Sequence, residues 1–183
     1  MKKHLVALSF GIATVLTGTN AFANTGTINF EGKITSSTCP IDVVNPGDGS
    51  VGNLVKMGSI EASRFTAIGQ EYSGKSFVLR VKGGAGCNYT STGNTASVQF
   101  NGAADPSGDY FAVTPTFDGA KGVVINIKDR KGVALKPGAN SPDYDLNDTG
   151  STDLLFNAFY RSTSTTVTAG VASADVQFIV AIN

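Results

Sequence analysis

Short runs in which apolar and polar residues alternate recur along the chain, and they constrain its fold most strongly. Alternation with a period of two is typical of strands, and no segment has the sustained period of 3.6 that indicates a helix. Clusters rich in Gly, Pro, Asn and Asp separate the runs, and 22 of the 183 residues are Gly. We expect strands at residues 27–34, 51–57, 77–81, 96–100, 110–117, 123–128, 133–135, 154–161 and 176–182, with a short helical turn within 59–70. Many short strands joined by turns predict an antiparallel β-sandwich.

The N-terminal segment has the features of a secretory signal peptide. A basic stretch at residues 2–4 precedes an apolar run at residues 5–16, and the tripeptide Ala-Phe-Ala at 21–23 fits a small-residue cleavage site. The apolar run is shorter than the roughly 20 residues that a membrane-spanning helix needs. We therefore expect residues 1–23 to be a signal peptide that is removed, and we expect no membrane span.

Export would place the mature chain in an oxidising compartment, where disulfides persist. Two cysteines remain, Cys39 and Cys87, and we expect them to form one disulfide. Closing a loop of this length would stabilise the fold by about 4 kcal/mol. Two free buried thiols are the alternative. Cleavage also removes His4, the only histidine, so the mature chain has no imidazole for catalysis or for holding a metal.

The charge balance argues against a nucleic-acid partner. Lys plus Arg and Asp plus Glu each number 14, and charged residues make up only 15% of the chain. Phosphate binding needs a surplus of basic groups. No catalytic constellation or metal-ligand cluster stands out, so we predict that the protein is not an enzyme and has no metal and no cofactor.

The first and the last predicted strands both raise the question of what pairs with them. Residues 27–34 alternate strictly and start within about four residues of the expected new N-terminus. They form either the first strand of the sandwich or a strand in the sheet of another chain, and the period does not choose between these alternatives. Residues 176–182 are followed only by Asn183. We expect a sandwich without its final strand to expose a hydrophobic groove that another chain must fill.

Several short motifs follow one another in a characteristic order. In chain order they are Phe30-x-Gly32, Cys39, the Phe-x-Leu-x-Val run at 77–81, Cys87, the sequence LLFNAFY at 154–160, the segment 167–174, and the alternating terminal strand. In this order and spacing the chain resembles the subunits of chaperone–usher pili (fimbriae) of Gram-negative bacteria, and the resemblance covers the whole chain. One departure is the penultimate residue, which is Ile182 where the family usually has tyrosine.

The resemblance implies an all-β fold, an incomplete immunoglobulin-like β-sandwich of six strands plus an N-terminal donor-strand extension. Residues 24–36 would form the extension and residues 37–183 the pilin domain. The implied donor-strand residues are Ile28, Phe30, Gly32 and Ile34, and the residues implied to line the acceptor groove are Val176, Phe178, Val180 and Ile182.

The resemblance also implies partners and a function. A periplasmic pilus chaperone would lend a strand to the groove, and at an outer-membrane usher the extension of the next subunit would replace that strand. Neighbouring pilin subunits would form a head-to-tail homopolymer, a fimbria at the cell surface that supports bacterial adhesion. The alternative is a minor or tip-associated pilin, or an adhesin that binds a receptor glycan directly. A single domain with an intact extension favours the shaft over a two-domain tip adhesin.

Overall fold

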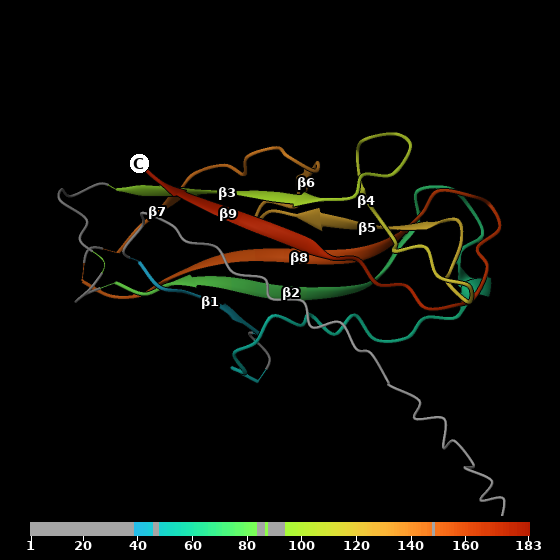
Figure 1. The fold of residues 1–183 in the computed structure, drawn as a ribbon, viewed down its shortest axis with the longest axis horizontal. Coiled ribbons are helices and arrows are strands. Elements are labelled where there is room, and N and C mark those ends of the chain that lie inside the picture. Colours follow the sequence, from blue (N-terminus) through green and yellow to red (C-terminus); the bar gives the residue numbers. More distant parts are fainter. Residues whose placement is uncertain (1–38, 46–47, 84–86, 88–93, 148) are drawn as a thin grey trace, which may run out of the picture. The chain divides into compact units, whose positions relative to one another are not determined.

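The computed structural model describes residues 39–45, 48–83, 87, 94–147 and 149–183. Residues 35–183 form one compact unit, and its described part is all-β apart from a 3-10 helix at Ala62–Arg64 (Figure 1). The predictions for the N-terminus concern residues outside the described ranges. They are the signal peptide 1–23, the extension 24–36 and the donor residues Ile28, Phe30, Gly32 and Ile34.

Two antiparallel sheets make up the body (Figure 1). The first sheet runs in the order β1 (Ile41–Val44), β2 (Glu71–Val81), β8 (Thr152–Ser162), β5 (Val123–Lys128) and β4 (Phe111–Ala112), with β6 (Ala134–Leu135) also paired to β5. The second sheet runs in the order β7 (Tyr144–Asp145), β3 (Thr95–Gly102) and β9 (Val176–Ile182). Within the described ranges, six strands have four or more residues and three have only two.

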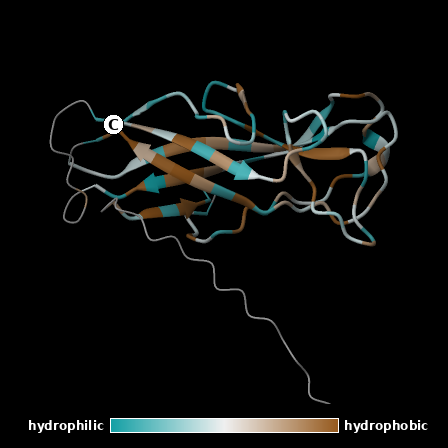
Figure 2. Ribbon diagram, turned by 45° about the horizontal axis from the view of Figure 1, so that its top comes forward, coloured by the Kyte–Doolittle hydropathy of each residue, from teal (hydrophilic) through white to brown (hydrophobic). Residues whose placement is uncertain are grey.

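The core lies between the inward rows of side chains from the two sheets, and hydrophobic and hydrophilic residues alternate along the long strands (Figure 2). Rings from both sheets meet at its centre. Phe156 of β8 lies 4.9 Å from Phe100 of β3 and 5.7 Å from Phe77 of β2, measured between ring centroids. Such pairs each contribute about 0.5–1.5 kcal/mol beyond the area that they bury. The aromatic cluster therefore fixes the two sheets face to face.

The predicted strands at 123–128 and 176–182 are confirmed as β5 and β9, but the strand predicted at 51–57 is wrong. Val51 forms only an isolated bridge with Val44, across a turn in which Gly49 has a φ of 69°. Residues 52–57 belong to no strand. Val55 and Met57 both pack on the core from an irregular segment. Their spacing of two residues therefore resembles the pattern of a strand although no strand forms.

The strand predicted at 110–117 is much shorter in the structure. Only β4 forms there, since the N–H of Thr114 donates to the carbonyl of Ser173 instead (2.7 Å) and Pro115 has no N–H to offer. The helical turn expected within 59–70 is confirmed by the 3-10 helix. The short strands β1 and β7 were not predicted, because two to four residues carry too little pattern.

Candidate functional site

The outer edge of β9 is the most unusual feature of the sandwich. All seven residues of β9 pair with β3, in a register that runs from Val176 opposite Gly102 to Ile182 opposite Ala96. Among the described residues, no strand pairs with the other edge of β9. A strand paired on one side directs about half of its N–H and C=O groups away from that partner. We call this side of β9 the acceptor edge, because its backbone groups can bind another strand.

The side chains of β9 divide into two rows. Val176, Phe178, Val180 and Ile182 are half-buried and pack against the core, whereas the residues between them are exposed. These four are the residues that the sequence predicts to line the acceptor groove. The same half-buried row continues before the strand, through Ala174 and Ala172.

Half-buried apolar residues also lie in β1 and in the segment that follows it. Ile41 and Val43 of β1, and Val55 and Ile60 after it, pack against the core without being fully covered. Among the described strands, β1 lies at one edge of the first sheet, as β9 lies at one edge of the second. Each sheet thus has an edge strand whose apolar residues are only partly covered, and a further strand would bury them.

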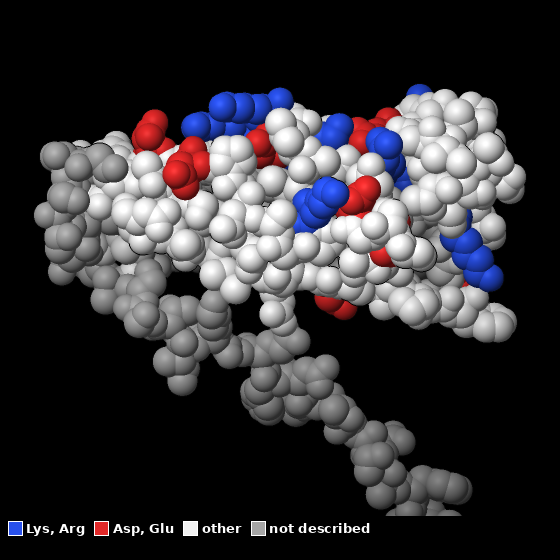
Figure 3. Space-filling model, turned by 90° about the horizontal axis from the view of Figure 1, so that it is seen from above, with Lys and Arg blue, Asp and Glu red and all other residues white. Residues whose placement is uncertain are grey.

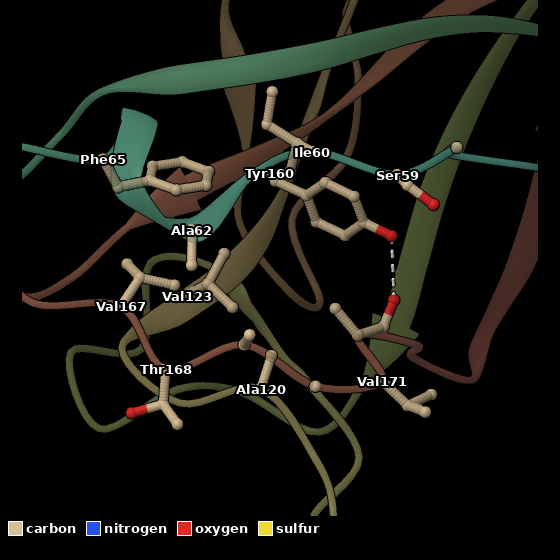
Figure 4. Close-up of a pocket in the computed structure, with 14 residues that line it drawn as sticks. Ser59, Ile60, Ala62, Phe65, Ala120, Val123, Tyr160, Val167, Thr168 and Val171 are labelled. Carbon is tan, nitrogen blue, oxygen red and sulfur yellow. Dashed lines mark hydrogen bonds between the residues drawn. The ribbon is translucent and has the colours of Figure 1, made fainter.

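A pocket of about 500 Å³ lies at the end of the sandwich where β9 begins. Its lining side chains in Figure 4 are mostly apolar, with Phe65 and Ile60 on one side and Val167, Val171 and Ala120 on the other. Ala172 both lines the pocket and belongs to the half-buried row that leads into β9. The pocket therefore continues the row, and its lining suits an aliphatic side chain.

The one aromatic hydroxyl in the pocket lining already has a hydrogen-bond partner. Tyr160 of β8 donates from its hydroxyl to the carbonyl of Ala172 at 3.0 Å (Figure 4). Burial raises the pKa of the Tyr160 phenol above its usual range, so the group stays a neutral donor at physiological pH. This hydrogen bond fixes the segment before β9 against β8, and it holds that wall of the pocket in place.

The cysteines predicted to pair do so. The disulfide Cys39–Cys87 has a Cα–Cα distance of 4.2 Å and closes a loop with a sequence separation of 48. Cys39 lies two residues before β1, so the bond fixes the point at which the chain enters the sandwich. Any segment preceding Cys39 is therefore attached to the body at a defined place.

A polar cluster, missed by the sequence analysis, lies across β2, β5 and β8. Glu71 accepts hydrogen bonds from Asn126 (2.7 Å), Lys128 (2.5 Å) and Arg161 (2.9 Å). Burial alone would raise the pKa of Glu71, but hydrogen bonds from these three donors outweigh it, so the pKa lies below the usual range of a glutamate. The residues come from three strands that are far apart in the sequence, and no spacing rule brings those strands together. The cluster is a structural network that joins three strands.

Three further observations concern possible metal sites, membrane helices and surface charge in the described ranges. In them, no group of three or more His, Cys, Asp or Glu side chains is placed to hold a metal ion. No helix in the same part of the chain is long and apolar enough to cross a membrane. The charged residues on the face seen in Figure 3 are of both signs and interspersed.

Comparison with solved structures defines the class of this fold. A Burkholderia pseudomallei antigen and type I fimbria protein has a TM-score of 0.56 and 31% identity over 85% of this chain and 97% of its own. The P pilus rod subunit PapA has a TM-score of 0.61, 18% identity, and coverage of 80% and 100%. The CupB6 tip adhesin of Pseudomonas aeruginosa has a TM-score of 0.53 and 19% identity, over 69% of this chain but 35% of the adhesin. The body is an immunoglobulin-like sandwich of the chaperone–usher pilin class.

Sequence relatives are consistent with that class and extend over the whole chain. The probable major fimbrial subunit LpfA of Escherichia coli O157:H7 is 34% identical over 182 residues, which cover 97% of this chain and 95% of LpfA. Long polar fimbria protein A of Salmonella typhimurium is 32% identical, with the same coverage. The sequence model of the fimbrial protein family matches residues 28–183. The chain belongs to the fimbrial protein family, as a structural subunit of a surface fimbria and not an enzyme.

Proposed function

We propose that this chain is a shaft subunit that polymerises head to tail by donor-strand exchange. Residues 24–36 of one copy would add a strand to the acceptor edge of the preceding copy. The observation that carries the proposal is β9, which is paired along one edge while its inward row remains half-buried. Strand addition of this kind is an established mode of recognition in pilins. Because the donor and the acceptor edge are different segments of the chain, the contact is heterologous and can propagate as a filament.

The spacing of the donor segment supports this pairing. Residues 28–34 number seven, like the residues of β9, and alternate residues would bury one row of side chains. If the donor completes an antiparallel sheet, its C-terminal end lies beside the start of β9. Ile34 would then reach the apolar pocket that is lined by Ala172 and Tyr160.

The same edge explains why the subunit would need assembly partners. An unpaired strand edge beside half-buried apolar side chains is an aggregation hazard. We propose that a periplasmic pilus chaperone pairs with the acceptor edge before assembly, and that exchange takes place at an outer-membrane usher. The Ile182 position belongs to the half-buried row, so the departure from tyrosine keeps the apolar character of the row there.

The sequence relatives favour a shaft role. LpfA, which this chain matches over 95% of LpfA, is a probable major fimbrial subunit. A direct glycan-binding role, as in a tip adhesin, would call for a receptor site beyond the strand-acceptor edge. We therefore propose that the chain supports adhesion by building the fimbria.

Substitution of Gly32 by Asn tests the exchange. A polar side chain forced into an apolar groove without a partner is costly, so we expect Gly32→Asn to abolish polymers while the chaperone-bound subunit is still produced. The measurement is the ladder of subunit multimers on unheated SDS gels, with the yield of chaperone complex as the test of folding.

Gly132→Asn is the matched control. Gly132 has a φ of 81° with nothing within 4 Å of the added Cβ, and Asn tolerates that conformation. We expect this variant to polymerise normally. Polymer formation by Gly32→Asn at the wild-type level would disprove the role given to Gly32.

A further inference from the structure

The end of the sandwich around the pocket is a built surface made of three segments, residues 58–70, 114–122 and 163–172, which we call the loop end (right-hand end in Figure 1). Backbone hydrogen bonds join the segments. Gly69 donates to the carbonyl of Ser162, which directly precedes the third segment (2.9 Å), Thr163 donates to Gly122 (2.9 Å) and Ala120 donates to Val171 (2.9 Å). The loops are therefore held in one arrangement and can present a defined surface.

Three large apolar side chains are exposed on the loop end. Phe117 is fully exposed, with a relative accessibility of 107%, and Ile68 and Val171 are exposed to 66% and 53%. Phe117 occupies a turn in which Gly119 donates to the carbonyl of Thr116 (3.1 Å). Most residue types fit such a turn, and polar ones are the usual choice. The fold of the single subunit thus gives no reason for a phenylalanine there.

The charges of the loop end point to a neutral partner. Its segments contain Glu61, Arg64, Asp118 and Lys121, two acidic and two basic side chains. A polyanion or an anionic membrane would require a basic excess. Exposed apolar residues on a charge-balanced surface instead suit a protein surface with little net charge.

The length of the chain before Cys39 specifies which protein surface comes close. If Ile34 of the next subunit sits in the pocket, only four residues separate it from Cys39, and the five Cα–Cα steps between the two span at most about 18 Å. Cys39 is fixed to the body of that next subunit by its disulfide. The body of the next subunit must therefore begin within about 18 Å of the pocket, beside the loop end.

We infer that Phe117, with Ile68 and Val171, contacts the body of the next subunit around its Cys39. That surface carries the exposed Pro40, whose carbonyl accepts from the N–H of Lys82 (3.0 Å). Beside it, Lys82 and Asp42 neutralise each other in a salt bridge of 2.7 Å. The two facing surfaces are thus charge-balanced, and burial of Phe117 between them adds an apolar contact to the strand exchange. The inference rests on the proposed donor-strand polymerisation.

Photo-crosslinking in assembled fimbriae tests the contact. A benzophenone amino acid replaces Phe117, which keeps an aromatic side chain at the turn, and the filaments are irradiated, boiled with a reducing agent and digested with trypsin. Reduction is needed because the Cys39–Cys87 disulfide otherwise joins peptide 34–56 to peptide 83–121, which contains position 117. We expect a covalent dimer on the boiled gel, in which position 117 is joined to the tryptic peptide 34–56 that contains Cys39 and Pro40. The control places the same group at Val133, which is 57% exposed in the turn after β5 and lies outside the loop end. It should not give that dimer.

The possible outcomes separate the contact from the polymerisation itself. A 117-to-(34–56) dimer supports the contact. Polymers that form normally but give no such dimer, or a dimer through another peptide, overturn the contact and leave donor-strand exchange standing. Absence of multimers from the wild-type chain with its chaperone and usher would overturn both.

As a second measurement, Phe117→Ser should keep the unheated ladder but yield filaments that are at least twofold more flexible by electron microscopy than Val133→Ser filaments. Equal flexibility would contradict the contact.

Discussion

The strands β8 and β9 have nearly the same sequence pattern but different surroundings. Both are antiparallel strands with alternating apolar residues, and β8 is paired along both edges, with β2 and β5, whereas β9 is paired only with β3 among the described residues. In β8 the inward Leu154 and Phe156 have no exposed surface, while in β9 the inward Phe178 and Val180 remain half-buried. The comparison shows that the alternating pattern marks the inward face of a strand, and that the presence of a neighbour on each side decides how deeply that face is buried.

The largest expected effect tests the difference in burial between β8 and β9. Phe156→Ala removes a ring from the fully buried cluster and should destabilise the body by about 3–5 kcal/mol. Phe178→Ala removes a half-buried ring and should cost roughly half as much, but it should weaken binding of a peptide of residues 24–36. Urea unfolding of the body without the peptide measures the first effect, and peptide competition measures the second. The control is Ile179→Ala, on the exposed face of β9.

Equal destabilisation by Phe156→Ala and Phe178→Ala, with unchanged peptide affinity in both, would contradict the difference between the two strands. It would mean that β9 is as completely buried as β8 without any added strand.

The disulfide gives the next largest expected effect, at the other edge strand. The bond at Cys39 anchors the chain just before β1, whereas β9 pairs only with β3 among the described strands. Cys39→Ser combined with Cys87→Ser should lower stability by about 4 kcal/mol, because the unfolded chain regains the entropy of a loop with a separation of 48. Thermal unfolding and the yield of chaperone-bound subunit measure the loss. Unchanged values of both would show that β1 needs no covalent anchor.

The smallest effect concerns pH and the polar cluster on β2, β5 and β8. The folded pKa of Glu71 lies below its unfolded value near 4.5, so its contribution is complete above pH 4.5 and is lost as the pH falls further. Glu71→Gln should therefore lower Tm at pH 7, and the difference from the wild type should shrink below pH 4.5. Glu61→Gln, at an exposed position, is the control. A difference in Tm that does not change between pH 7 and pH 3 would exclude this role of the Glu71 charge.

Much of the fold could be predicted from local patterns because long, alternating runs are distinctive. The runs that became β5, β8 and β9 were found in this way, and so was the disulfide, since two cysteines in an exported chain allow one pair. The pattern failed at 51–57, where alternation arises from loop side chains that pack on the core. It also missed β7, whose two residues pair with β3 only because tertiary contacts bring them there.

Part of the candidate site could likewise be predicted from the sequence, and part could not. The inward row of β9 could be read from the sequence, because the row depends only on the period of a strand. The pocket could not, because it joins Phe65, Tyr160 and residues 167–172 from separate segments. Tyr160 could be assigned to the inward face of β8, but no local signal shows that its hydroxyl holds the carbonyl of Ala172.

The sequence by itself determined which residues of each long strand face the interior and which two cysteines can join, because both follow from period and composition. Only the tertiary structure decided that β9 lies at the edge of a sheet among the described strands, that the half-buried row opens into a pocket, and that Glu71 meets Lys128 and Arg161. The physical reason is that strand pairing uses backbone groups that are the same at nearly every residue. A strand's own sequence therefore carries little information about which neighbour it has, or about whether an edge is left for another chain.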